Sequence, residues 1–169
     1  AALRADDAIP DLTVRLVGTV DPAVRASIRE HGLEPIVEIR DFVPHDEALR
    51  LMAGSALLLL VIEPFAQAKG MITSKLYEYL ASERPVLGVG PPGGDAGALL
   101  HRHDAGEVVA WNDARRAREL IHAHYEAWAA GSPTAGASRT DLQEHNRRNQ
   151  SRRMAQILDE VTTSRTQTA

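Results

Sequence analysis

The sequence predicts an α/β fold in which helices cover both faces of a parallel sheet, a three-layer α/β/α arrangement. Patterns typical of strands and of helices alternate about five times along the chain, with short loops between them. The segment Ala56–Ile62 is apolar without alternation, as in a strand buried on both faces of such a sheet. Short loops and this alternation indicate crossover connections between parallel strands. We therefore expect ligands to bind beyond the carboxyl ends of the strands.

The individual elements follow from side-chain periodicity and from signals at their ends. Leu12, Val14 and Leu16 alternate with their neighbours at the period of a strand, which ends at Gly18. Asp21 is the expected N-cap of a helix with proline in its first turn, running to residue 31. Further strands are expected at 36–39, 56–62, 85–89 and 107–110. Further helices are expected at 44–52, 74–82, 95–103 (with Asp95 as N-cap), 112–130 and 141–161, and a polar ending at 162–169 is expected to fray.

The composition is that of an ordinary globular domain and excludes several classes of protein. Of the 169 residues, 44% are hydrophobic and 25% charged, and the net charge of −4 argues against nucleic acid as the main partner. Cysteine is absent, which excludes disulfides, thiolate metal sites and a cysteine nucleophile. No apolar run is long enough to span a membrane, and Ala1–Arg4 does not begin a signal peptide. Because the chain lacks an initiator methionine, we expect it to be a fragment of a longer protein.

The chain divides into one domain and one terminal helix. We assign residues 1–140 to a single domain and 141–169 to a helix and tail that pack on this domain or toward another one. Four arginines make the last helix basic, which fits a solvated face, docking against another domain, or contact with an anionic membrane surface. These arginines are Arg147, Arg148, Arg152 and Arg153.

The segment from Gly70 to Ala81 carries the strongest signal for binding. It leaves the most apolar strand, passes a glycine and enters a helix, whose N-terminal amides and dipole suit a phosphate or pyrophosphate. Thr73 or Ser74 could cap this helix, but no Glu or Gln follows three residues later, so some amides stay free. Lys75 adds a positive charge, and Glu78 one turn on could accept hydrogen bonds from ribose hydroxyls. The alternative is an ordinary amphipathic helix with a Lys75–Glu78 surface pair.

Two other interpretations of the chain remain open. Gly88–Gly93 matches the glycine pattern of a dinucleotide-binding oxidoreductase, although two prolines remove amides there and Asp95 puts a carboxylate at the same helix end. The other is a non-catalytic nucleotide-binding or receiver-like domain. A receiver would need an aspartate at the end of the central strand, where this chain has Glu63-Pro64.

The histidines predict no metal site. His101 and His103, like His122 and His124, are two residues apart and point to different sides of a helix, so neither pair is suited to share a metal ion. His45 differs because it follows the second strand on the expected ligand side. It is either a helix-start residue or a ligand contact.

Several segments in this order resemble the C-terminal half of a GT-B glycosyltransferase of the group 1, or family 4, type. The resemblance covers most of the chain. Its most specific part is Ser74–Leu87, with Tyr-Glu-Tyr-Leu-Ala followed by Arg-Pro-Val. The segments Arg15–Gly18 and Phe42–Leu49, the pair Gly94-Asp95, Gly106 and the closing helices fit as well.

The resemblance implies a Rossmann-like domain that binds a sugar nucleotide. In the family, a glutamate matching Glu78 holds the ribose, amides matching Ser74 and Lys75 bind the pyrophosphate, and a loop matching Val43 and Pro44 touches the base. Groups matching Met71 and Ile72 face the donor sugar, and catalysis is usually retaining and independent of metal and cofactor. The candidate donor-binding residues are therefore Gly18, Val43, Pro44, His45, Gly70, Met71, Ile72, Thr73, Ser74, Lys75 and Glu78.

The sequence departs from the family pattern in two ways. Gly70 stands where the family often has a first glutamate that contacts the sugar. The strand that usually precedes the one ending at Gly18 is missing, as is the N-terminal acceptor domain. We expect a donor-binding half that is inactive alone, works in the cytoplasm with its acceptor domain, and contacts the membrane surface at most peripherally.

Overall fold

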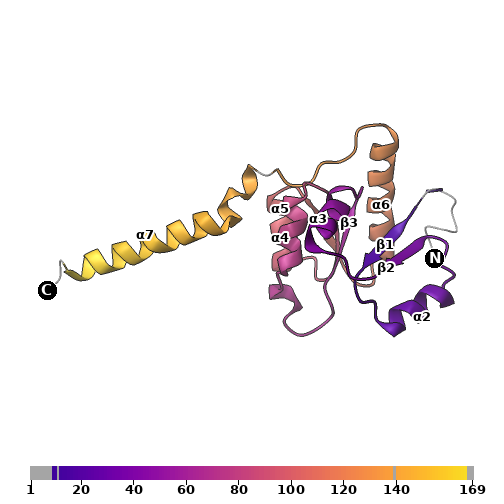
Figure 1. Ribbon diagram of the computed structural model, residues 1–169, viewed down its shortest axis with the longest axis horizontal. Helices are drawn as coiled ribbons and strands as arrows, with labels where there is room; N and C mark the ends of the chain where they lie inside the picture. Colours follow the sequence, from indigo (N-terminus) through magenta and orange to yellow (C-terminus); the bar gives the residue numbers. More distant parts are fainter. Residues whose placement is uncertain (1–8, 11, 139, 167–169) are drawn as a thin grey trace.

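Strands and helices alternate along the chain, and the expected Rossmann-like α/β class is confirmed (Figure 1). The structure is a computed structural model that describes residues 9, 10, 12–138 and 140–166. The strands are β1 (Val14–Val17), β2 (Val37–Arg40), β3 (Leu58–Val61), β4 (Val86–Val89) and β5 (Gly106–Val109). The helices are α2 (Pro22–Glu30), α3 (His45–Ala53), α4 (Ser74–Ala81), α5 (Asp95–Arg102), α6 (Ala114–Ala129) and α7 (Arg147–Thr166). Two short 3₁₀ turns are η1 (Ala68–Gly70) and η2 (Asp141–His145).

The strands pair in parallel, as expected, but they form two sheets where one was predicted. β1 pairs with β2 from Val14 opposite Val37. The second sheet has the order β3-β4-β5, with Leu58 opposite Val86 and Val86 opposite Gly106. β3 is therefore an edge strand of its sheet, and among the described residues no strand joins it to β1 or β2.

The best-packed part of the molecule is the three-stranded sheet with α4 and α5. Leu76 and Leu80 on α4 and Leu100 on α5 are fully buried. They belong to one core cluster with Leu58 and Leu60, two alternate residues of β3 that are also buried. Burial of a leucine side chain contributes roughly 1.5–3 kcal/mol, so this cluster fixes the positions of α4 and α5 on the sheet.

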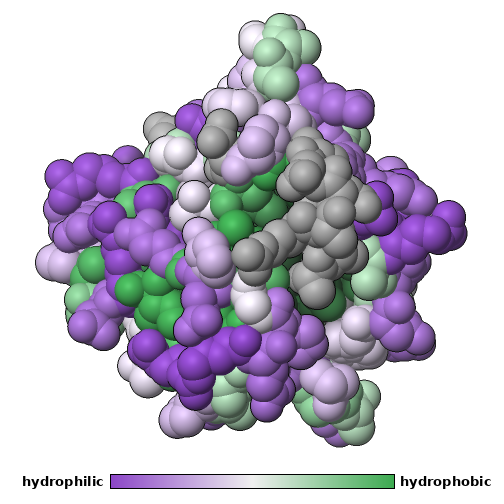
Figure 2. Space-filling model, turned by 90° about the vertical axis from the view of Figure 1, so that its right-hand side faces the viewer, coloured by the Kyte–Doolittle hydropathy of each residue, from purple (hydrophilic) through white to green (hydrophobic). Residues whose placement is uncertain are grey.

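The expectation that β3 is buried on both faces is wrong. Leu58 and Leu60 are buried, whereas Leu59 is 46% exposed and Val61 59% exposed. The strand is covered on one face only, although its sequence is apolar throughout. Apolar side chains also reach the surface among hydrophilic ones on the face that Figure 2 shows.

The helix ends match the expected capping in one case and differ in another. Asp21 caps α2 as expected, its Oδ1 accepting a hydrogen bond from the Ala23 amide at 2.7 Å. Asp95, in contrast, is the first residue inside α5, and the N-cap is Gly94 without a side-chain bond. The Gly94 backbone is extended (φ −92°, ψ 171°), so the chain enters the helix one residue earlier than the Asp95 cap required.

The last helix begins later than expected and extends away from the rest of the chain (Figure 1). η2 and α7 take the place of a single helix from residue 141, and α7 is helical through Thr166 where fraying was expected. Residues 167–169 lie outside the described part of the chain. Met154, Ile157, Leu158 and Val161 form an exposed apolar stripe on α7. Among the described residues, no helix has the length and apolar character to cross a membrane.

Candidate functional site

The carboxyl ends of β3, β4 and β5 lie together at one edge of the sheet. Because the strands are parallel, the loops that follow them leave from the same edge. The Ile62 amide donates to the Val89 carbonyl and the Gly90 amide to the Val109 carbonyl, each at 2.9 Å. Trp111, just after β5, donates from Nε1 to the Ile62 carbonyl at 2.6 Å. These bonds hold the starts of the three loops in register.

The loop from β3 to α4 is held against the first turn of α5. η1 forms part of this loop, and Ala68 within it is buried in the core. A Cβ atom placed on Gly94 would lie 2.8 Å from the Lys69 carbonyl oxygen, so the two backbones are in close contact. A Cβ atom on Gly70 would lie 3.9 Å from Oδ2 of Asp95. The loop that leads into α4 therefore has a fixed path.

The N-terminus of α4 carries no side-chain cap. Thr73 is the N-cap residue, with extended backbone (φ −85°, ψ 153°), and its hydroxyl makes no capping bond. Thr73 Oγ1 is buried and has no hydrogen-bond partner among the described residues. The first amides of an α-helix have no partner inside the helix. The helix end thus presents free amide donors and one unused hydroxyl.

Both lysines of the chain, Lys69 and Lys75, lie in this turn, while the other basic residues of its 19 Lys and Arg are arginines. Lys69 belongs to η1 and Lys75 to the first turn of α4. Both are exposed. Within the described residues neither forms an ion pair with a carboxylate. Lys75 was predicted as a site residue and Lys69 was not, although the sequence shows that both lysines of the chain lie close to the start of this helix.

Glu78 lies one turn beyond Lys75 and is half-buried. Among the described residues, the structure contains no Lys75–Glu78 ion pair, which was the central feature of the alternative amphipathic-helix interpretation. The neighbouring Tyr79 donates its hydroxyl hydrogen bond to the Leu59 carbonyl at 3.4 Å. Burial, and secondarily the charge of Glu78, raise the pKa of Tyr79. The Tyr79 side chain therefore stays neutral and fixes this face of α4 to β3.

The remaining predicted site residues lie after β1 or β2, or in the turn before α4. Gly18 follows β1 with φ +106°, a conformation that favours glycine. Val43 and Pro44 follow β2, and Pro44 is the N-cap of α3 without a side-chain bond. His45 is the first residue of α3 and is exposed. Met71 and Ile72 lie in the turn before α4, with Met71 packed against the core.

Packing explains two of the three glycines of the Gly88–Gly93 pattern, Gly88 and Gly90. A Cβ atom on Gly88 would lie 2.6 Å from Val108 Cγ2, and one on Gly90 would lie 3.0 Å from Ile62 Cβ. Side chains at these positions would collide with the neighbouring strands. The close approach of strands therefore accounts for both glycines without a dinucleotide.

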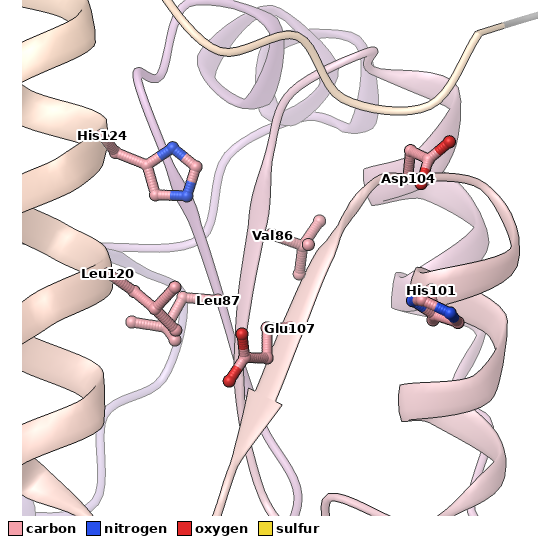
Figure 3. Close-up of a pocket in the computed structure, with 8 residues that line it drawn as sticks. Val86, Leu87, His101, Asp104, Glu107, Leu120 and His124 are labelled. Carbon is pink, nitrogen blue, oxygen red and sulfur yellow. The ribbon is translucent and has the colours of Figure 1, made fainter.

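A hollow of about 270 Å³ lies at the opposite edge of the sheet (Figure 3). Val86 and Gly106, the first residues of β4 and β5, line it. His124 projects into it from α6, and burial lowers the pKa of this histidine. The hollow lies at the amino ends of the strands, away from the free helix N-terminus, so the two features are separate.

The structure brings together two histidines and a glutamate, side chains of kinds that bind metals, in a cluster that the sequence did not predict. His103 approaches Glu144 and His145, from which 41 and 42 positions separate it in the chain. In the sequence, His103 stands two residues from His101, with which it is not suited to share a metal ion. No local pattern in the sequence joins His103 to residues of η2, because only the path of the linker brings them together.

The comparisons with known proteins add no assignment. No protein-family model matches the chain, and a search of the curated proteins finds no match.

Proposed function

We propose that this chain is the donor-binding domain of a glycosyltransferase that uses a nucleoside-diphosphate sugar. The observation that carries the proposal is the N-terminus of α4, which has no side-chain cap. Lys75 lies in its first turn and Lys69 in the preceding η1, and neither forms an ion pair among the described residues. This helix end lies at the edge of a parallel sheet where α/β domains bind their ligands. A diphosphate group matches this set of free amides and cations in charge and in hydrogen-bonding capacity.

Each residue of the turn has one role in the proposed complex. The amides of Ser74 and Lys75 donate hydrogen bonds to the diphosphate, and the Lys75 ammonium offsets its charge. The Glu78 carboxylate, one turn further along the same helix, accepts hydrogen bonds from the vicinal hydroxyls of the ribose. Met71 and Ile72 face the sugar, and Val43, Pro44 and His45, with Gly18, lie toward the base.

The same contacts would promote transfer of the sugar. As the bond between sugar and diphosphate breaks, negative charge grows on the leaving diphosphate oxygen. Preorganised amides and a lysine stabilise that charge more than they stabilise the intact donor, and this lowers the barrier. We propose a retaining, metal-independent transfer on the strength of the family resemblance.

The proposed reaction requires a partner that holds the acceptor. We propose a second domain for this role, and the exposed apolar stripe of α7 supports a docking partner of this kind. The arginines at the start of α7 suit an anionic membrane surface as a further peripheral contact. We propose a cytoplasmic location for the protein.

The test is a binding screen with UDP, GDP, dTDP and NAD, followed by the Glu78→Ala variant. At least one nucleoside diphosphate should raise the melting temperature, and Glu78→Ala should weaken its binding about ten- to a hundredfold by calorimetry, because two ribose hydrogen bonds to a carboxylate are lost. Glu126→Ala is the matched control, because Glu126 is an exposed carboxylate on α6. Stabilisation by NAD alone, or equal binding by Glu78→Ala and its parent, would overturn the proposal.

A further inference from the structure

The second cluster of polar side chains lies where the chain leaves the domain for α7. His103 is the C-cap residue of α5, and Glu144 and His145 are the last two residues of η2. The two imidazole rings face each other edge to face, with centroids 5.1 Å apart and Nε2 atoms 3.0 Å apart. Glu144 Oε1 lies 3.4 Å from the Nε2 atom of His145 and 3.8 Å from that of His103. Three potential ligand atoms thus converge on one point.

The spacing of these atoms matches one face of a tetrahedral zinc site. Zinc binds imidazole nitrogen at about 2.0–2.1 Å and carboxylate oxygen at about 2.0–2.2 Å, so two ligand atoms of a tetrahedral ion lie about 3.3 Å apart. The three measured separations, 3.0, 3.4 and 3.8 Å, lie around this value. An ion therefore fits between the three atoms at ordinary bond lengths with little movement of the side chains.

Packing holds the two histidines, and Glu144 Oε1 is shared with Arg102, whose Nη1 lies 3.7 Å from it and would move aside for a metal ion. The His103 side chain is only 3% exposed and that of His145 17% exposed, while the Glu144 carboxylate reaches the surface. Tyr77 on α4 packs against the His145 ring, with centroids 5.4 Å apart. Packing therefore holds both rings with their Nε2 atoms toward the same carboxylate oxygen. Two imidazoles and one carboxylate are ligands that zinc accepts.

We propose that His103, Glu144 and His145 bind one zinc ion, and that this ion fixes the segment before α7 to the domain. His103 belongs to the domain, whereas Glu144 and His145 precede α7 by only a few residues. Zinc at this point would link η2 to the end of α5 and set the direction in which α7 leaves. The cluster follows the C-terminus of α5, at the sheet edge opposite the α4 turn, so the ion takes no part in the proposed transfer; water would fill its fourth position.

The affinity should be moderate. Metal-binding histidines usually donate their second ring N–H to a partner, and losing that partner costs roughly 10- to 100-fold in affinity. Nδ1 of His103 is buried without a hydrogen-bond partner among the described residues. We therefore expect zinc to bind roughly 10- to 100-fold more weakly than it would if His103 Nδ1 had a partner.

Calorimetry of the full chain with zinc chloride after chelator treatment tests the site. We expect one ion per chain, and at least a tenfold loss of affinity in His145→Gln and in Glu144→Gln. His101→Gln is the matched control, since His101 lies on α5 two residues from His103 and is exposed. The circular dichroism of each variant must match the parent. No binding below millimolar zinc, or an equal loss in the control and in His145→Gln, would overturn the site.

Hydrogen exchange tests the structural role of the ion. Saturating zinc should slow amide exchange in 142–146 at least tenfold in the parent and leave it unchanged in His145→Gln. The free amides of the α4 turn should exchange at the same rate with and without zinc. Zinc that binds without slowing exchange in 142–146 would contradict the proposed link to α7.

Discussion

The two edges of the three-stranded sheet differ in the partners of their ionisable side chains. At the carboxyl edge, the N-terminus of α4 is uncapped and Lys69 and Lys75 form no ion pair within the described residues. At the amino edge, side chains from distant segments engage one another, as in the contact between His103 and His145. Similarly, Glu107 near the start of β5 accepts two hydrogen bonds from Arg116, at 2.9 and 2.7 Å. We propose an external anion as the partner of the lysines at the first edge, whereas the charged pair at the second edge has its partner within the chain.

The largest expected effect comes from Gly94, whose backbone contacts η1 in the loop between β3 and α4. Gly94→Ala should lower the free energy of unfolding by about 1–3 kcal/mol, because its Cβ would collide with the Lys69 backbone, which has to move. Urea denaturation measures this loss, and nucleoside diphosphate binding should weaken with it.

Gly93→Ala is the matched control for this substitution. A Cβ atom on Gly93 would meet nothing within 4 Å. The free energy of unfolding of Gly93→Ala should therefore stay within about 0.5 kcal/mol of that of the parent. An equal loss in both variants would show that the contact between Gly94 and η1 does not hold the turn.

A smaller effect is expected from Lys75. Lys75→Ala should weaken nucleoside diphosphate binding about two- to fivefold at low salt, and the difference should shrink as salt rises, because an exposed charge is screened. Calorimetry at two salt concentrations measures it. Lys75→Arg keeps the charge and should bind within about twofold of the parent. A loss that is the same at both salt concentrations would argue against a role for the charge.

The smallest effect is expected at the amino edge, from the Glu107–Arg116 pair. The Arg116 hydrogen bond lowers the pKa of Glu107, so the folded state binds a proton at this carboxyl less readily than the unfolded chain does. The pair therefore stabilises the fold above the unfolded pKa of about 4.3 and loses this contribution as the pH falls through the lower, folded pKa. Arg116→Gln should have a slightly lower urea midpoint than the parent at pH 7, with the two converging in acid. A difference that widens in acid would contradict this account.

Local signals in the sequence predicted much of the fold and of the carboxyl-edge site. Asp21-Pro22 carries a capping side chain and a helix-starting proline, and α2 begins there. Ser74 opens a helix with no acidic partner three residues on, and this helix end is uncapped. Each of these features depends on residues within one helical turn of each other. Interactions over so short a distance along the chain can be predicted from a single sequence.

The features that the sequence did not predict depend on distant segments. The apolar residues of β3 suggested burial on both faces, but burial depends on which elements cover the strand, and Leu59 and Val61 are exposed. His103 and His145 approach each other only because the linker after α6 returns to the end of α5. Nothing near either histidine in the sequence signals this contact.

The most direct test of the carboxyl-edge site is the response of individual amides to ligand. In ¹⁵N-labelled chain, the nucleoside diphosphate that binds best should shift the amide resonances of Ser74 and Lys75, and the corresponding nucleoside without phosphate should leave them in place. That result would locate the diphosphate at the uncapped end of α4. Shifts confined to residues 90–94, or equal shifts with the nucleoside alone, would contradict the account.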